Sequence, residues 1–190
     1  MSKYQDPAVK VTCPDEALRL LKEGNARFVA NSLVPTDYPA ALDKTGTQQS
    51  PFASVLTCAD SRCSPEIYFD QGIGNIFVCR NAGNFADREA IGSLQFAANV
   101  LGSQIIVVVG HTGCGAVKNA HAGTVTSLPE LDGILADLGP IVKDCPDWEK
   151  DGVPANVKAQ VEALKKAPGI SVPVYGAEYD IATGEIKFIA

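Results

Sequence analysis

The chain has 190 residues, of which 46% are hydrophobic and 20% are charged, and its formal net charge is −6. This size and composition predict a single globular domain, residues 1–190, rather than a disordered chain. The acidic balance argues against nucleic acid or an anionic membrane surface as a partner.

Neither a membrane anchor nor a secretion signal is predicted. The chain contains no run of about 18 apolar residues, and residues 1–10 lack the apolar core of a signal peptide. We therefore expect a cytoplasmic protein, or an organellar one if a transit peptide was removed. The six cysteines are expected to be reduced, because the chain is large for a disulfide-stapled scaffold.

The first 50 residues or so predict a helical arm ahead of a core at about 51–190. Thr12-Cys13-Pro14-Asp15-Glu16 combines a hydroxyl cap, an early proline and acidic first-turn residues, which is typical of a helix start. Apolar residues then recur at helical spacing as far as Val29. Residues 33–50 are rich in proline and polar residues and predict an irregular connection.

The core alternates strand and helix patterns. The run Ile105-Ile106-Val107-Val108-Val109 is decisive, because five consecutive β-branched residues without polar alternation indicate a strand buried on both faces, as in a parallel sheet. The C-terminal segments 172–179 and 185–189 flank a turn and predict a closing hairpin. We therefore expect an α/β fold, with a mainly parallel central sheet flanked by helices and an antiparallel C-terminal edge hairpin. Further strands are predicted at 52–57 and 73–79, and helices at 65–69, 86–101, 115–121, 127–142 and 155–167.

The helix at 127–142 carries its own start signal. Ser127-Leu128-Pro129-Glu130 matches a capping box, in which the Ser127 hydroxyl caps the helix. Gly139-Pro140 is expected to disturb the last turn of this helix.

Two thiols and one imidazole follow the ends of predicted strands. Cys58 follows the strand at 52–57, whereas His111 and Cys114 follow the strand at 105–109. Open α/β sheets bind ligands beyond the carboxyl ends of their strands, so these side chains can meet. Two thiolates and an imidazole suit Zn²⁺, and three protein ligands leave a fourth position for water, which is typical of a catalytic zinc.

An acidic and a basic residue accompany the first thiol. Asp60 and Arg62 follow Cys58 by two and four residues, positions that share a face in an extended segment. Ionised Asp60 would accept a hydrogen bond from a zinc-bound hydroxide, and Arg62 would hold Asp60 and lower its pKa. A structural salt bridge is the plainer alternative, but the adjoining metal motif favours the functional interpretation.

The pattern C-x-D-x-R, followed about fifty residues later by H-x-x-C-G, resembles the β-class carbonic anhydrases. The resemblance covers roughly residues 14–190. It implies an enzyme with one Zn²⁺ per chain that reversibly hydrates CO₂ to bicarbonate and a proton through zinc-bound hydroxide. Further matching stretches are Gly24-Asn25-Ala26-Arg27-Phe28, Pro65-Glu66, Arg80-Asn81-Ala82-Gly83-Asn84, Gly176-Ala177-Glu178-Tyr179-Asp180 and Thr183-Gly184.

The resemblance also implies substrate contacts. Gln49 stands where plant-type relatives carry a substrate-contacting glutamine, Phe77 and Ala82 stand at apolar wall positions, and Gly115 stands where a backbone amide faces substrate. Without the family, Phe77 would be interpreted as ordinary core. Relatives that close their site at low pH carry a tryptophan three residues before the first cysteine. This chain has Val55 there, so we expect the ordinary open form.

Members of the family form dimers in which N-terminal helices embrace the neighbour, so a homodimer or a higher homo-oligomer is expected. Two alternative functions remain open, namely hydrolysis of carbonyl sulfide or carbon disulfide, and a non-catalytic zinc or redox sensor using Cys63 or Cys79. The Asp60–Arg62 pair argues against a sensor, which has no need of an oriented hydroxide. His121 is a candidate proton carrier, although a plain surface histidine is the more ordinary interpretation.

Overall fold

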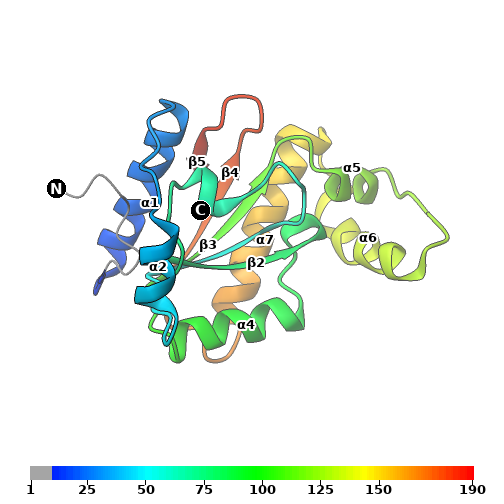
Figure 1. The fold of residues 1–190 in the computed structure, drawn as a ribbon. Helices are drawn as coiled ribbons and strands as arrows, with labels where there is room; N and C mark the ends of the chain where they lie inside the picture. The colour runs from blue at the N-terminus through cyan, green and yellow to red at the C-terminus, as the bar shows by residue number, and fades with distance from the viewer. Residues whose placement is uncertain (1–9) are drawn as a thin grey trace.

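The computed structural model describes residues 10–190 and is built around a five-stranded sheet in the order β2-β1-β3-β4-β5 (Figure 1). Residues 1–9, which belong to the predicted arm and to the stretch searched for a secretion signal, lie outside the described residues. Within residues 10–190 no helix has the length and apolar character needed to cross a membrane. The strands are β1 Ala53–Cys58, β2 Ile76–Asn81, β3 Ile105–His111, β4 Val174–Tyr179 and β5 Ile186–Phe188.

Helices cover both faces of the sheet and one of its ends. They are α1 Pro14–Val29, α2 Tyr38–Thr45, α3 Pro65–Tyr68, α4 Arg88–Asn99, α5 Gly115–His121, α6 Pro129–Val142 and α7 Val153–Lys166. Two short elements complete the chain, the 3-10 helix η1 Ala82–Asn84 and the π-helical turn η2 Trp148–Gly152.

The predicted fold class is confirmed. Strand β1 pairs in parallel with β2 and with β3, β3 pairs in parallel with β4, and β4 pairs antiparallel with β5. Every residue of β3 is buried, as its unbroken β-branched run predicts. Alternate side chains of β3 enter two separate apolar clusters, one shared with α1 and α3 and the other with α4 and α7.

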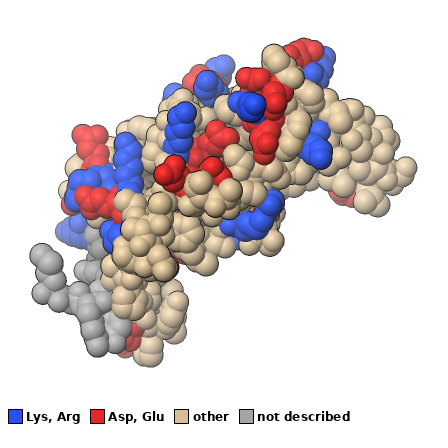
Figure 2. All heavy atoms as spheres, turned by 90° about the horizontal axis from the view of Figure 1, so that it is seen from above, with Lys and Arg blue, Asp and Glu red and all other residues tan. Residues whose placement is uncertain are grey.

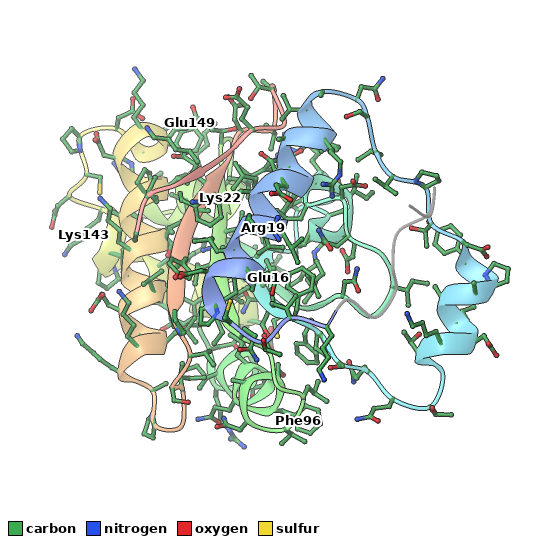
Figure 3. The ribbon with its side chains drawn as sticks, turned by 90° about the vertical axis from the view of Figure 1, so that its left-hand side faces the viewer. Glu16, Arg19, Lys22, Phe96, Lys143 and Glu149 are labelled. Carbon is green, nitrogen blue, oxygen red and sulfur yellow. The ribbon has the colours of Figure 1, made fainter. Side chains whose placement is uncertain are left out.

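One buried amide adds polar contacts to the apolar packing of helix α1. The Asn25 side chain donates from Nδ2 to the carbonyl oxygens of Tyr68 (3.0 Å) and Gly184 (2.8 Å), and its Oδ1 accepts from the Ile186 amide (2.9 Å). This one residue therefore joins α1 to α3 and to the β4–β5 hairpin. The outer face of α1 presents Glu16, Arg19 and Lys22 (Figure 3).

The connection predicted to be irregular, residues 33–50, contains helix α2, so that prediction is wrong. Asp37 caps α2 by accepting a hydrogen bond from the Ala40 amide (3.2 Å), and Pro39 occupies the first turn, where a missing N–H is tolerated. The second strand begins at Ile76 rather than at residue 73, because Gly74 adopts a positive φ of 88° and the chain turns there.

The capping box predicted at Ser127 is also absent. Ser127 has a φ of 63°, and the Asp132 carboxylate, from the first turn of α6, accepts hydrogen bonds from the amides of Thr126 (2.7 Å) and Ser127 (3.1 Å). The carboxylate therefore orders the segment that precedes the helix. Helix α6 continues past Pro140 and ends at Val142.

Charged residues of both signs lie close together on the face seen from above (Figure 2). Acidic side chains gather near the middle of this face, with lysine and arginine side chains beside them. The positive charges on this face are therefore offset locally, in keeping with the overall balance of −6.

Replacing Gly24 with alanine is expected to lower the free energy of unfolding by about 2 kcal/mol, as overpacking of a tight contact does. A Cβ atom on Gly24 would overlap the carbonyl oxygen of Phe69, which is backbone and cannot swing aside. Urea unfolding monitored by circular dichroism measures the change.

Gly133→Ala is the matched control, because nothing lies within 4 Å of an added Cβ at this exposed position of α6. Its higher helix propensity should raise the free energy of unfolding by up to about 1 kcal/mol. Equal gains in both variants would show that α1 does not approach α3 as closely as described.

Candidate metal centre

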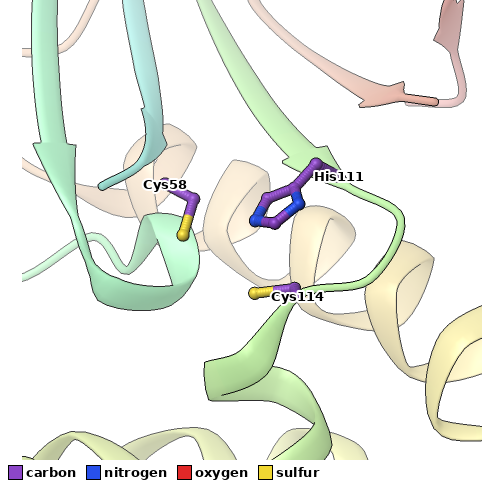
Figure 4. A group of neighbouring side chains, drawn as sticks. All are labelled: Cys58, His111 and Cys114. Carbon is purple, nitrogen blue, oxygen red and sulfur yellow. The ribbon is translucent and has the colours of Figure 1, made fainter. Parts of the chain in front are cut away.

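Cys58, His111 and Cys114 converge at the carboxyl end of the parallel strands (Figure 4). Cys58 ends β1, His111 ends β3, and Cys114 immediately precedes α5. All three are buried, and one potential ligand atom from each lies within 4.8 Å of the other two. The predicted meeting of these residues across the sheet is therefore confirmed.

The orientation of His111 leaves one ring nitrogen available to a ligand. Its Nδ1 lies 2.9 Å from the carbonyl oxygen of Thr112, which only accepts, so Nδ1 carries the proton and donates. Nε2 is buried and has no hydrogen-bond partner within residues 10–190. An unpaired buried nitrogen costs about 1–3 kcal/mol, a penalty that a bound metal ion removes.

The two thiols are joined by a hydrogen bond. The bond from the Cys114 thiol holds the pKa of Cys58 well below its usual range, and the amide of Gly83 also donates to the Cys58 sulfur (3.4 Å). The hydrogen bond to Cys58 and burial raise the pKa of Cys114. A cation that displaces the shared proton would bind two thiolates and one imidazole nitrogen, a donor set that fits Zn²⁺.

Asp60 and Arg62 form a bidentate ion pair. Arg62 Nε lies 2.8 Å from Asp60 Oδ1, and its terminal nitrogen Nη2 lies 2.6 Å from Oδ2. The Arg62 side chain thereby holds the pKa of Asp60 well below its usual range. The carboxylate is thus committed to Arg62 and lies outside the group of three ligand atoms.

The extended segment predicted from Cys58 to Arg62 is absent. Strand β1 ends at Cys58, and the next residues form a turn in which the amide of Cys63 donates to the carbonyl oxygen of Asp60 (3.0 Å). Arg80 of β2 braces this turn by donating to the carbonyl oxygens of Cys58 (3.2 Å) and Asp60 (2.6 Å).

The loop that carries His111 and Cys114 is held by groups that sequence patterns did not single out. The Thr112 amide donates to the Tyr179 carbonyl oxygen (3.0 Å), and the Thr112 hydroxyl accepts from the Ile181 amide (3.1 Å). The Gly113 amide donates to a carboxylate oxygen of Glu149 (2.6 Å). Glu149 lies in a charged stretch that is typical of a solvated surface, so no sequence signal pointed to it.

Helix α7 holds the opposite side of the site. Asn156 donates from Nδ2 to the carbonyl oxygen of Gly83 (2.8 Å), and Gln160 donates to Asn156 Oδ1 (2.8 Å). Both amides are buried, and they fix η1, whose Gly83 amide reaches Cys58. Polar residues on the buried face of a helix could have been noticed in the sequence, but their partner in η1 is visible only in the fold.

The predicted substrate contacts lie in different places. Ala82 begins η1 and Gly115 begins α5, so both adjoin residues of the metal centre. Phe77 of β2 is half-buried and lines a surface hollow together with Phe96 of α4. Gln49 is exposed and lies beside Val100 and Leu101, near the end of α4 that is far from Cys58.

The remaining cysteines and the second histidine are described by their burial and their hydrogen bonds. All six cysteines are free thiols, as expected. Cys63 is buried, whereas Cys79 is half-buried and its burial raises its pKa. His121 donates from Nε2 to the carbonyl oxygen of Cys145 (2.9 Å) and so ties α5 to the segment after α6.

The comparison with known proteins agrees with this geometry. The carbonic anhydrase family model matches residues 53–186. "Carbonic anhydrase 2" of Mycobacterium tuberculosis is 45% identical over 115 residues, which cover 58% of this chain and 54% of that protein. The match therefore spans about half the length of this relative.

Other relatives match over more of their length. "Carbonic anhydrase" of Pseudomonas aeruginosa is 30% identical over 194 aligned positions, covering 89% of this chain and 86% of that protein. Among solved structures, a tetrameric β-carbonic anhydrase of Sordaria macrospora superposes with a TM-score of 0.72 at 23% identity, covering 93% of this chain and 98% of the other. The fold, the arrangement of ligand residues and the family match lead to one conclusion: the chain belongs to the β-class carbonic anhydrase family.

Proposed function

We propose that this protein is a zinc-dependent carbonic anhydrase that interconverts CO₂ with bicarbonate and a proton. The observation that carries the proposal is a buried group of two thiols and an imidazole nitrogen that has no partner in the described part of the chain, flanked by the Asp60–Arg62 pair. Membership of the carbonic anhydrase family supports it.

Each residue of the site has a role in this proposal. Cys58, His111 and Cys114 hold one zinc ion through two thiolates and Nε2. Zinc, when bound, supplies the nucleophile by lowering the pKa of water toward neutrality, and it offsets negative charge that develops on the substrate. Asp60 accepts a hydrogen bond from the nucleophile and so directs a lone pair at the carbon of CO₂. Arg62 keeps Asp60 ionised and fixes its two oxygens.

The substrate is small and apolar, which suits a pocket with few polar groups. We propose that Ala82 forms an apolar wall and that the amide of Gly115, at the start of α5, faces an oxygen of the substrate. Phe77 lies four residues before Asn81, the strand partner of Cys58, and lines a hollow with Phe96, so we propose that it forms an apolar wall in the pocket of a second copy. Gln49 lies away from Cys58 within one chain, so its contact with substrate would have to be made in the pocket of a second copy.

A homo-oligomer is therefore part of the proposal. Large apolar side chains are exposed on the arm and on the nearby part of α4, which is typical of a surface that pairs with another protein. The relative from Sordaria macrospora is described as tetrameric. The exposed side chains are Val29, Leu33, Tyr38, Leu42, Phe96 and Val100.

Zinc content tests the metal site. The purified chain should contain about one zinc ion, and Cys114→Ser should lose most of it, because a hydroxyl is a far weaker zinc ligand than a thiolate. Elemental analysis after dialysis measures the content. Cys145→Ser, the matched control at a half-buried thiol away from the cluster, should keep its zinc. A wild-type chain without zinc would refute the site.

Replacing Asp60 with asparagine tests the activity. We expect the rate of CO₂ hydration in a stopped-flow assay to fall roughly 10²-fold, the usual consequence of losing one preorganised hydrogen-bonding group. Zinc content should stay unchanged, because Asp60 is not among the ligand atoms. A zinc-loaded wild type that hydrolyses carbonyl sulfide but does not hydrate CO₂ would contradict the proposal and favour the sulfur-gas alternative.

Replacing Val100 with glutamate tests the oligomer. Val100 is 66% exposed beside Gln49, so a charge there should dissociate the proposed assembly and lower its mass in sedimentation velocity. Val125→Glu, on the exposed loop between α5 and α6, is the control and should leave the mass unchanged. Dissociation by the control alone would place the interface elsewhere and remove the proposed role of Gln49.

A further inference from the structure

We propose that Glu149 is a positioning residue of the metal centre and that it acts on His111 through a single peptide group. The inference rests on the zinc site proposed above. It extends that site by one residue, which lies outside the ligand motifs.

The geometry joins the two side chains through the amide between Thr112 and Gly113. The nitrogen of this amide donates to Glu149 Oε1 at 2.6 Å. The oxygen of the same amide, which belongs to Thr112, accepts from His111 Nδ1 at 2.9 Å. Because the N–H and C=O of a trans peptide point in opposite directions, Glu149 and His111 form hydrogen bonds to opposite sides of the amide.

Such an arrangement strengthens both hydrogen bonds. A carboxylate that accepts from an N–H forms a short, charge-assisted bond and increases the negative charge on the carbonyl oxygen of the same amide. That oxygen then holds the Nδ1–H of His111 more firmly. Metal-binding histidines commonly donate a hydrogen bond from their second ring nitrogen to a carboxylate or a carbonyl oxygen. This bond sets the tautomer and the orientation of the ring. Here both groups take part, with the carboxylate one amide further away.

Glu149 is itself held in a defined position. It lies in the π-helical turn η2, whose first residues are capped by Asp147, since the Asp147 carboxylate accepts from the amides of Glu149 (2.8 Å) and Lys150 (2.9 Å). The Asp151 carboxylate accepts from the Asp147 amide in return (3.1 Å). Figure 3 shows Glu149 at the end of the molecule opposite Phe96. Single π-helical turns of this kind are frequent at functional sites.

The loop has other anchors, so Glu149 is not needed simply to keep it in place. Thr112 is bound to Tyr179 and Ile181 at the β4–β5 hairpin, and the Gly113 carbonyl oxygen lies 3.5 Å from Arg62 Nη2. What Glu149 adds is the bond to the one amide whose oxygen faces the imidazole.

The test compares zinc release from the loaded wild type, Glu149→Ala, Glu149→Gln and the control Glu162→Ala. Glu162 is an exposed carboxylate on α7 that pairs only with Lys165 among the described residues. Release to a coloured chelator should be about tenfold faster in Glu149→Ala, the lower end of the range for groups that support metal ligands. Glu149→Gln should be intermediate, because its amide oxygen still accepts but carries no charge, and the control should match the wild type.

A second readout reports on the imidazole directly. The chain has only two histidines, so ¹⁵N-histidine labelling gives two sets of ring resonances. In Glu149→Ala the Nδ1 proton of His111 should move upfield as its hydrogen bond weakens, while the ring of His121, which binds the Cys145 carbonyl, should not change.

The inference is overturned if Glu149→Ala releases zinc at the wild-type rate and leaves the His111 resonance in place, even if that variant unfolds at a lower temperature. These readouts do not depend on turnover. A zinc-loaded wild type without CO₂ hydration would defeat the proposed activity while leaving the role of Glu149 intact. Normal hydration with unchanged zinc release would defeat the role of Glu149 alone.

Discussion

The metal centre depends on the parallel pairing of β1 with β3. The register places Thr57 opposite Val109, so the two strands end side by side and deliver Cys58 and His111 to the same edge of the sheet. A buried bond from the Thr57 hydroxyl to the Val109 carbonyl oxygen (3.0 Å) supports this register just before the ligands. A slip of one residue would turn one ligand to the opposite face. The other contacts of the site refine the positions of side chains that this strand pairing has already brought together.

Polar groups that support the site come from elements far apart in the chain. The turn after β1 is braced from β2, η1 is held from α7, and the loop after β3 is held from η2 and from the β4–β5 hairpin. Buried polar groups are expensive unless they are paired, and almost all of these groups are paired. Within residues 10–190 the Nε2 of His111 and the Nδ2 of Asn84, in η1, are exceptions, and Nε2 is the atom that a metal ion would take.

The sequence predicted the fold class and the three ligand residues because those signals are local. The β-branched run of β3 needs no knowledge of its neighbours, and the ligand types with their positions at strand ends already indicate a zinc site. The pair of Asp60 and Arg62 was predicted correctly as a pair, but for the wrong reason, since a turn and not an extended strand brings the two side chains together.

What could not be predicted depends on contacts between distant segments. The cap of α2 by Asp37 was local and could have been recognised, whereas the bond from Gly113 to Glu149 spans 36 positions and leaves no pattern in either segment. Gln49 shows a different limit, because a single chain places it away from the residues with which its family position associates it.

The π-helical form of η2 makes the site sensitive to chain length in a way that composition does not reveal. A π-turn accommodates one residue more than an α-helical turn, and η2 leads directly into α7. Loss of one residue here would let the segment continue α7 as regular α-helix. Each residue of an α-helix is rotated by about 100° from the last, so the carboxylate of Glu149 would then point away from Gly113. A deletion in this turn would in this way be felt at the imidazole, and insertions and deletions here should therefore be under stronger selection than the charged sequence of the turn implies.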